Sequence, residues 1–175
     1  MFVNKLTPIF YDETAAFNDR IAAGIMLVAT ELAILPMHVR FLKKDCLNYT
    51  PDGRPIVSVD IPHKWPANQR PLTANQRPLN YLCSPKLEKT LKELLKLRQQ
   101  SPRAKESPYL LAPDIKCCKS DVTKPIRVVW LCAKFRKFFR PNFQLNDIGL
   151  YMSWKLYHSN KPTLYIEDKE DKRFD

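Results

Sequence analysis

Positively charged side chains interspersed with aromatic residues are the clearest chemical signal in this sequence. Six positive charges and no negative charge lie between Lys124 and Arg140, and three phenylalanines stand among them. Lysine and arginine bind a phosphate backbone by releasing its counterions, whereas a solvated helix surface is the alternative explanation for such a run. With a formal net charge of +11, the sequence predicts DNA as a partner. The expected DNA contacts are Lys89, Lys92, Lys96, Lys124, Arg127, Lys134, Arg136, Lys137 and Arg140.

Signatures of metal and cofactor binding are missing from the sequence. Its three glycines build neither a P-loop nor a dinucleotide-binding motif. The three histidines, His38, His63 and His158, are far apart and form no HExxH pair, and the five cysteines form no CxxC. We therefore expect no metal, no cofactor, and free thiols in a reducing cytosol.

Hydropathy predicts no membrane span. The longest run of low polarity, Ala22 to Leu35, has 14 residues and contains Glu31, whereas a span needs about 20 apolar residues. The first six residues lack the pattern of a secretory signal. The expected location is the cytoplasm, in association with the nucleoid.

Periodic apolar residues predict several helices. One is a buried helix that has Asp12 or Thr14 as its cap and ends at Pro36. The clearest begins at Ser84-Pro85, where serine caps the helix and proline takes its first position. It carries leucines on one face and Lys86, Lys89, Lys92, Lys96 and Arg98 on the other. Further helical stretches are expected at residues 38–45, 125–139 and 146–156, and the inward side of the second of these should include Ile126, Val129, Trp130, Ala133 and Phe138.

A small sheet is expected beside these helices. Residues 50–54 have the composition of a turn, and the alternation in residues 56–61 predicts a half-buried strand. A heptapeptide that occurs twice in residues 67–80 indicates a loop or the edge of a hairpin, because each copy contains a proline. The predicted fold class is α+β, mostly helical with a small antiparallel sheet.

Four segments together resemble the catalytic domain of the tyrosine recombinases, or phage integrases. His158-Ser159-Asn160-Lys161-Pro162-Thr163-Leu164-Tyr165 is similar to the family's terminal motif, though about two residues shorter. Residues 143–149 are similar to its "f-x-L-H-D-L-R" segment, and residues 61–72 to the hairpin that carries its lysine. Residues 22–47 are similar to its first buried helix and the segment after it. The order of these motifs holds over essentially the whole chain.

The resemblance implies a role for each matching residue. Tyr165 would be the nucleophile on a phosphodiester, Lys64 the general acid, and His158 a hydrogen-bond donor to the transition state. Both catalytic arginines of the family are missing from their motifs, and Arg40, about two helical turns away from the first position, is the nearby substitute. Losing one such contact typically slows a reaction about a hundredfold to a thousandfold.

The sequence therefore predicts a DNA-binding protein of this family that does not cleave DNA, with an accessory or regulatory role in recombination or integration. Whether it is an enzyme stays open. One alternative is an active recombinase that uses Tyr165, completed by Arg40 or a partner protomer; another is a decayed remnant or an unrelated basic domain with protein or RNA partners. A homo-oligomer or a recombinase partner is expected. Residues 1–165 should form a single domain, followed by an acidic tail at residues 166–175 that lies against the basic surface.

Overall fold

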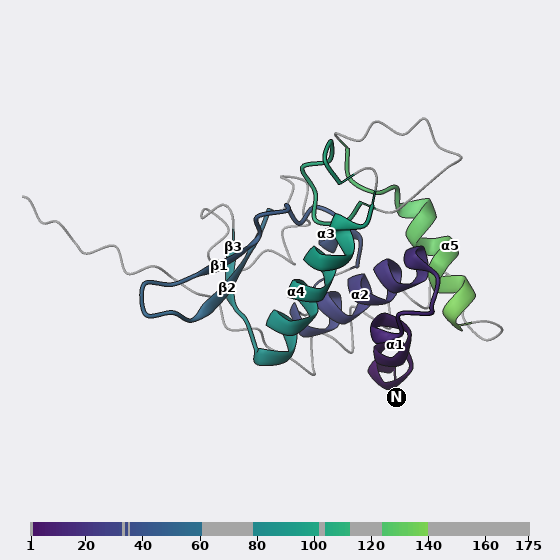
Figure 1. Cartoon of the computed structure of the whole chain (residues 1–175), viewed down its shortest axis with the longest axis horizontal. Coiled ribbons are helices and arrows are strands. Elements are labelled where there is room, and N and C mark those ends of the chain that lie inside the picture. The colour runs from purple at the N-terminus through teal and green to yellow at the C-terminus, as the bar shows by residue number, and fades with distance from the viewer. Residues whose placement is uncertain are drawn as a thin grey trace, which may run out of the picture.

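The chain forms five helices and a three-stranded sheet in the part that the computed structural model describes (Figure 1). The described residues are 2–32, 34, 36–60, 79–101, 104–112 and 124–139. The elements are α1 (Phe2–Tyr11), α2 (Phe17–Leu32), α3 (Pro36–Val39), β1 (Leu47–Tyr49), β2 (Pro55–Val59), β3 (Leu79–Leu82), α4 (Pro85–Gln99) and α5 (Val128–Phe139). The predicted α+β class with a small antiparallel sheet is confirmed. None of the helices in these ranges has the length and apolarity that a membrane span requires.

Several predicted features fall outside the described residues. They are Lys64, the repeated segment up to residue 78, Arg140, the helix at 146–156, His158, Tyr165, and the acidic tail with its boundary at residue 165.

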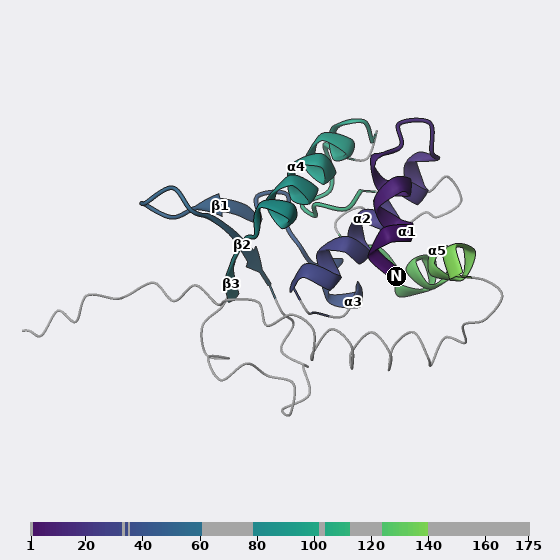
Figure 2. The same ribbon diagram turned by 90° about the horizontal axis from the view of Figure 1, so that it is seen from below.

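Helix α2 is the centre of the fold. Every residue from Asp19 to Ala29 is buried, and α2 contacts each of the other four helices. Both views place α2 and α1 between α4 on one side and α5 on the other (Figures 1 and 2). The predicted helix is confirmed, but both of its predicted ends are wrong: α2 begins at Phe17, after the predicted cap, and ends at Leu32, before Pro36, where α3 begins. Asp12 instead accepts hydrogen bonds from the backbone and hydroxyl of Thr14, in the turn that precedes α2.

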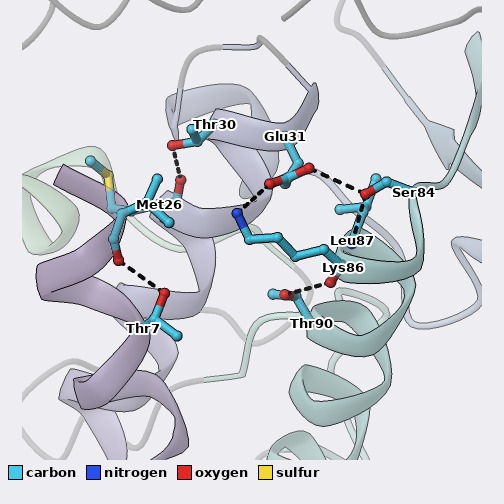
Figure 3. Close-up of polar contacts among 9 residues, drawn as sticks. Thr7, Met26, Thr30, Glu31, Ser84, Lys86, Leu87 and Thr90 are labelled. Carbon is cyan, nitrogen blue, oxygen red and sulfur yellow. Dashed lines mark hydrogen bonds and ion pairs between the residues drawn. The ribbon is translucent and has the colours of Figure 1, made fainter. Parts of the chain in front are cut away.

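Helix α4 forms as its sequence predicts. The hydroxyl oxygen of Ser84 accepts a hydrogen bond from the backbone N–H of Leu87, and Pro85 occupies the first turn. The same hydroxyl donates to Glu31 of α2, which also forms an ion pair with Lys86 at 2.7 Å (Figure 3). The buried side of the helix consists of Leu87, Thr90, Leu91, Leu94 and Leu97. The start of α4 is thus held on the end of α2, and its leucines enter the common core.

The sheet is antiparallel with the order β1-β2-β3. The predicted turn at residues 50–54 joins β1 to β2, and Gly53 adopts there a φ of 82° that suits glycine. The predicted strand is confirmed over Pro55–Val59, and Val57 and Val59 enter the core together with Tyr81 of β3. The predicted strict alternation is not, because Ile56 is buried next to Val57.

Two predicted helices differ from the structure. Residues 38–45 were expected to be helical, but α3 ends at Val39, because Leu42 and Lys44 form backbone hydrogen bonds with residues 108–110 instead. The inward side of α5 is confirmed in part: Ile126 is buried just before the helix, and Trp130 and Phe138 pack against the core. Val129, however, is 78% exposed, whereas Leu131 and Phe135, which were not predicted, are buried. Ala133 is exposed as well. The side that packs on the core is offset from the expected one, since every face of α5 offers apolar residues.

Candidate nucleic-acid interface

Three lysines form a row along the outer face of α4, which we call the lysine row. Lys89, Lys92 and Lys96 are all exposed, and their spacing of three and four residues places them on one side of the helix. At 1.5 Å of rise per residue, the row is about 10 Å long. Its residues were predicted as DNA contacts, and the structure brings them together on one surface.

The lysine row borders an open depression of about 410 Å³. It is lined by Pro85, Glu88, Lys89, Lys92, Glu93 and Lys96. Three of these residues are lysines, and the carboxylate of Glu93 pairs with the guanidinium of the buried Arg20, 3.1 Å away.

Two tyrosines from other elements support the lysine row. The ammonium nitrogen of Lys89 lies 5.2 Å from the ring centre of Tyr11 in α1, and that of Lys92 lies 5.9 Å from the ring centre of Tyr49 in β1. Such cation–π contacts are weak at exposed sites, about 0.5 to 1 kcal/mol. They bias the lysines toward one face, and Tyr49 itself is 51% exposed beside them.

Glu88 is the acidic residue inside the row. Its carboxylate forms an ion pair with Lys92 at 2.6 Å and accepts a hydrogen bond from the hydroxyl of Tyr49 at 2.9 Å. These two hydrogen bonds hold the pKa of Glu88 below its usual value, and the bond to Glu88 raises that of Lys92. Sequence reasoning missed Glu88 and both tyrosines. Glu88 stands four residues before Lys92, which is a typical spacing for an ion pair along a helix, so the sequence could have indicated Glu88.

Two lysines of α5 form ion pairs with an aspartate of another helix. Lys134 and Lys137 both bind the carboxylate of Asp19, which is 7% exposed in the first turn of α2. Burial alone would raise the pKa of Asp19, but the hydrogen bonds from the two lysines lower it below its usual value. The two predicted DNA contacts thus fasten α5 to α2. Of the other predicted contacts in this region, Lys124 and Arg127 are exposed, and Arg136 belongs to α5.

Two arginines also serve the fold. Arg40 donates a hydrogen bond to the carbonyl of Ile126 at 2.9 Å and stacks on Phe41 at 4.4 Å, so it anchors the segment that leads into α5. Arg98 was expected on the charged face of α4, but it donates to the carbonyls of Tyr109, Ala104 and Ser107. Its guanidinium therefore organises the loop of residues 104–112. Of the four predicted catalytic residues, only Arg40 belongs to the described ranges.

His38 in α3 is a half-buried titratable group that does not belong to the lysine row. Burial, together with the charge of Arg40, lowers the pKa of His38 to about 4. Among the described residues, no group of three or more histidine, cysteine and acidic side chains could hold a metal ion.

The burial of His38 makes stability depend on pH. Below its ordinary pKa near 6.5, the unfolded chain takes up a proton that the folded chain accepts only near pH 4. The free energy of unfolding should therefore fall as the pH is lowered across this window. We expect a contribution of about 1 kcal/mol, since solvent reaches part of the ring. Urea denaturation of the wild type and of His38→Gln at about pH 7 and about pH 5 measures it. An equal fall in both proteins would contradict the prediction.

Three of the four predicted catalytic side chains, Lys64, His158 and Tyr165, lie outside the described residues. Comparison of the chain with protein-family models, with curated proteins and with solved structures returns no match.

Proposed function

We propose that this protein binds duplex DNA through phosphate contacts made by the lysine row and does not cleave it. The observation that carries the proposal is the placement of Lys89, Lys92 and Lys96 on one exposed face of α4. Among the described residues, the ion pairs of α4 that involve lysine are made by Lys86 and Lys92, and not by Lys89 or Lys96. The net charge of +11 favours approach to any polyanion.

The dimensions of the row fit a DNA strand. Along the helix axis, the charges of one strand follow at intervals of about 3.4 Å, and neighbouring phosphates stand further apart in space than this rise, so a row about 10 Å long reaches about two neighbouring phosphates. Lysines that contact phosphates carry no sequence information, and binding should be similar for all sequences. The proposal is therefore a non-specific duplex contact rather than a base-reading site.

We propose that the protein does not cleave DNA because the guanidinium of Arg40 already binds a backbone carbonyl. A phosphodiester that is attacked by tyrosine needs arginines to bind its non-bridging oxygens, whereas Arg40 donates to the carbonyl of Ile126. We further propose that the domain is a degenerate relative of the tyrosine-recombinase catalytic domain, associated with the nucleoid. Its role would then be accessory or regulatory in DNA recombination or integration, with a second copy or a recombinase as partner. The motifs named above support this part of the proposal.

Removing one lysine of the row should weaken DNA binding. Lys89→Gln and Lys96→Gln should each lower affinity about fivefold to tenfold near 0.1 M salt, and each should reduce the slope of log affinity against log salt by about 1. Fluorescence anisotropy with a labelled duplex of about 20 base pairs at several salt concentrations measures both quantities.

Lys105→Gln is the matched control, because it removes the same charge from an exposed position in the loop of residues 104–112. It should leave affinity near that of the wild type. A wild-type protein that does not bind the duplex would overturn the proposed function. Equal affinities of the row variants and the control would show that DNA binds elsewhere.

A further inference from the structure

In the protein without DNA, Glu88 forms an ion pair with one of the three lysines of the lysine row. Its carboxylate lies 2.6 Å from the ammonium of Lys92, four residues further along the same helix. The other acidic residue of the depression, Glu93, is neutralised from the opposite side by the buried Arg20. Glu88 is therefore the carboxylate that faces an approaching anion together with the lysines.

The two partners of this ion pair are held to different degrees. The side chain of Glu88 is 22% exposed and receives the hydroxyl of Tyr49 from β1, whereas that of Lys92 is 58% exposed. A long, exposed lysine changes rotamer readily, while a carboxylate with a second hydrogen bond from another element stays in place. Lys92 also lies over the ring of Tyr49, but this contact is weaker than the hydrogen bond that holds Glu88, so we expect Lys92 to be the group that moves when the pair opens.

We propose that Glu88 is a built-in competitor for polyanions: it holds Lys92 in the free protein, and bound DNA must take Lys92 from it. This inference rests on the proposed function and deepens it, because it assigns a regulatory contact within the same site. The contacts from Tyr49 and Lys92 keep Glu88 ionised at neutral pH, which its lowered pKa also indicates.

The competition has a measurable consequence for affinity. With Glu88 in place, the row presents three positive charges and one negative charge to a phosphate strand, so one lysine releases few counterions. Neutral glutamine at this position frees Lys92 and keeps an oxygen that accepts the hydroxyl of Tyr49. Glutamine and glutamate have similar helix propensities, so α4 is retained.

Glu88→Gln should tighten binding of the labelled duplex about twofold to fivefold, the range that an exposed ion pair allows. The slope of log affinity against log salt should steepen by about 1, because one more lysine contacts phosphate. A change in folding alone would not steepen this slope. Anisotropy titrations on the full chain measure both values.

Two control variants separate the possible causes. Glu106→Gln removes the same charge at another exposed position and should alter affinity less than Glu88→Gln does. Tyr49→Phe removes the hydroxyl but leaves the ion pair, and should not tighten binding. If Tyr49→Phe tightens binding as much as Glu88→Gln, release of β1 and not competition for Lys92 is the cause, which overturns the inference.

The failure of the inference is distinct from that of the proposed function. If Lys89→Gln and Lys96→Gln weaken binding while Glu88→Gln leaves affinity and slope unchanged, the site stands and Glu88 is no competitor. If the wild type and Glu88→Gln both fail to bind the duplex, the proposed function fails first. If Lys92→Gln added to Glu88→Gln leaves the gain intact, the gain does not pass through Lys92 and the inference is wrong.

Discussion

Replacing Arg20 with alanine should lower the free energy of unfolding by about 3 to 5 kcal/mol, the range for breaking a buried ion pair. Arg20 is 6% exposed in α2; its guanidinium donates to the carbonyl of Phe10 in α1 and forms an ion pair with Glu93 in α4, both at 3.1 Å. The substitution removes the group that joins three helices and leaves the Glu93 carboxylate without its partner. Urea denaturation followed by circular dichroism measures the loss.

The matched control is Arg54→Ala. Arg54 pairs with Asp52 at 2.6 Å, but the two side chains are 57% and 56% exposed. Exposed pairs contribute about 0 to 1 kcal/mol, so this variant should stay close to the wild type. If Arg20→Ala destabilised the protein as little as Arg54→Ala, the buried pair would not hold the three helices together.

Gly24→Ala should destabilise the protein by about 3 kcal/mol, the upper end of the range for overpacking a core. In an unpacked helix the same change would stabilise, because alanine is the better helix former by about 1 kcal/mol. Here a Cβ on Gly24 would stand 2.6 Å from the ring of Phe10 and 2.7 Å from a methyl of Leu94. Both contacts are shorter than side chains tolerate, and the two neighbours come from α1 and α4.

The same denaturation experiment measures this loss, and a double variant tests its cause. Leu94→Ala alone should leave a cavity and destabilise, whereas Gly24→Ala combined with Leu94→Ala should lose less than the sum of the two, since the new methyl enters the vacated space. Strict additivity would contradict the crowding that the structure shows at Gly24.

The parts of the fold that the sequence predicted are those with local causes. The start of α4 depends on Ser84 and Pro85, which act within one turn of the helix. The turn before β2 depends on Gly53, and the strand after it on alternation between neighbours. Helix α1 was not predicted, because Pro8 disfavours a helix locally while the burial of Leu6 and Phe10 compensates.

In the candidate site, too, the features with local causes were predicted and those that depend on distant residues were not. Periodicity alone placed Lys89, Lys92 and Lys96 on one face of a helix, since that face follows from 3.6 residues per turn. It could not assign the charges of α5, because their partner Asp19 is more than a hundred residues away. The basic run at residues 124–140 therefore looked like a single DNA surface, although two of its lysines hold α5 on α2.

Tertiary structure decided which charged groups stay available, and the reason is geometric. A helix period states which residues share a face, but the partner of a side chain is whatever distant element packs against that face. Glu93 meets Arg20 and Arg98 meets the carbonyls of the loop at 104–112 only once the chain has folded. What remains on the surface of α4 is the lysine row, with Glu88 among its lysines.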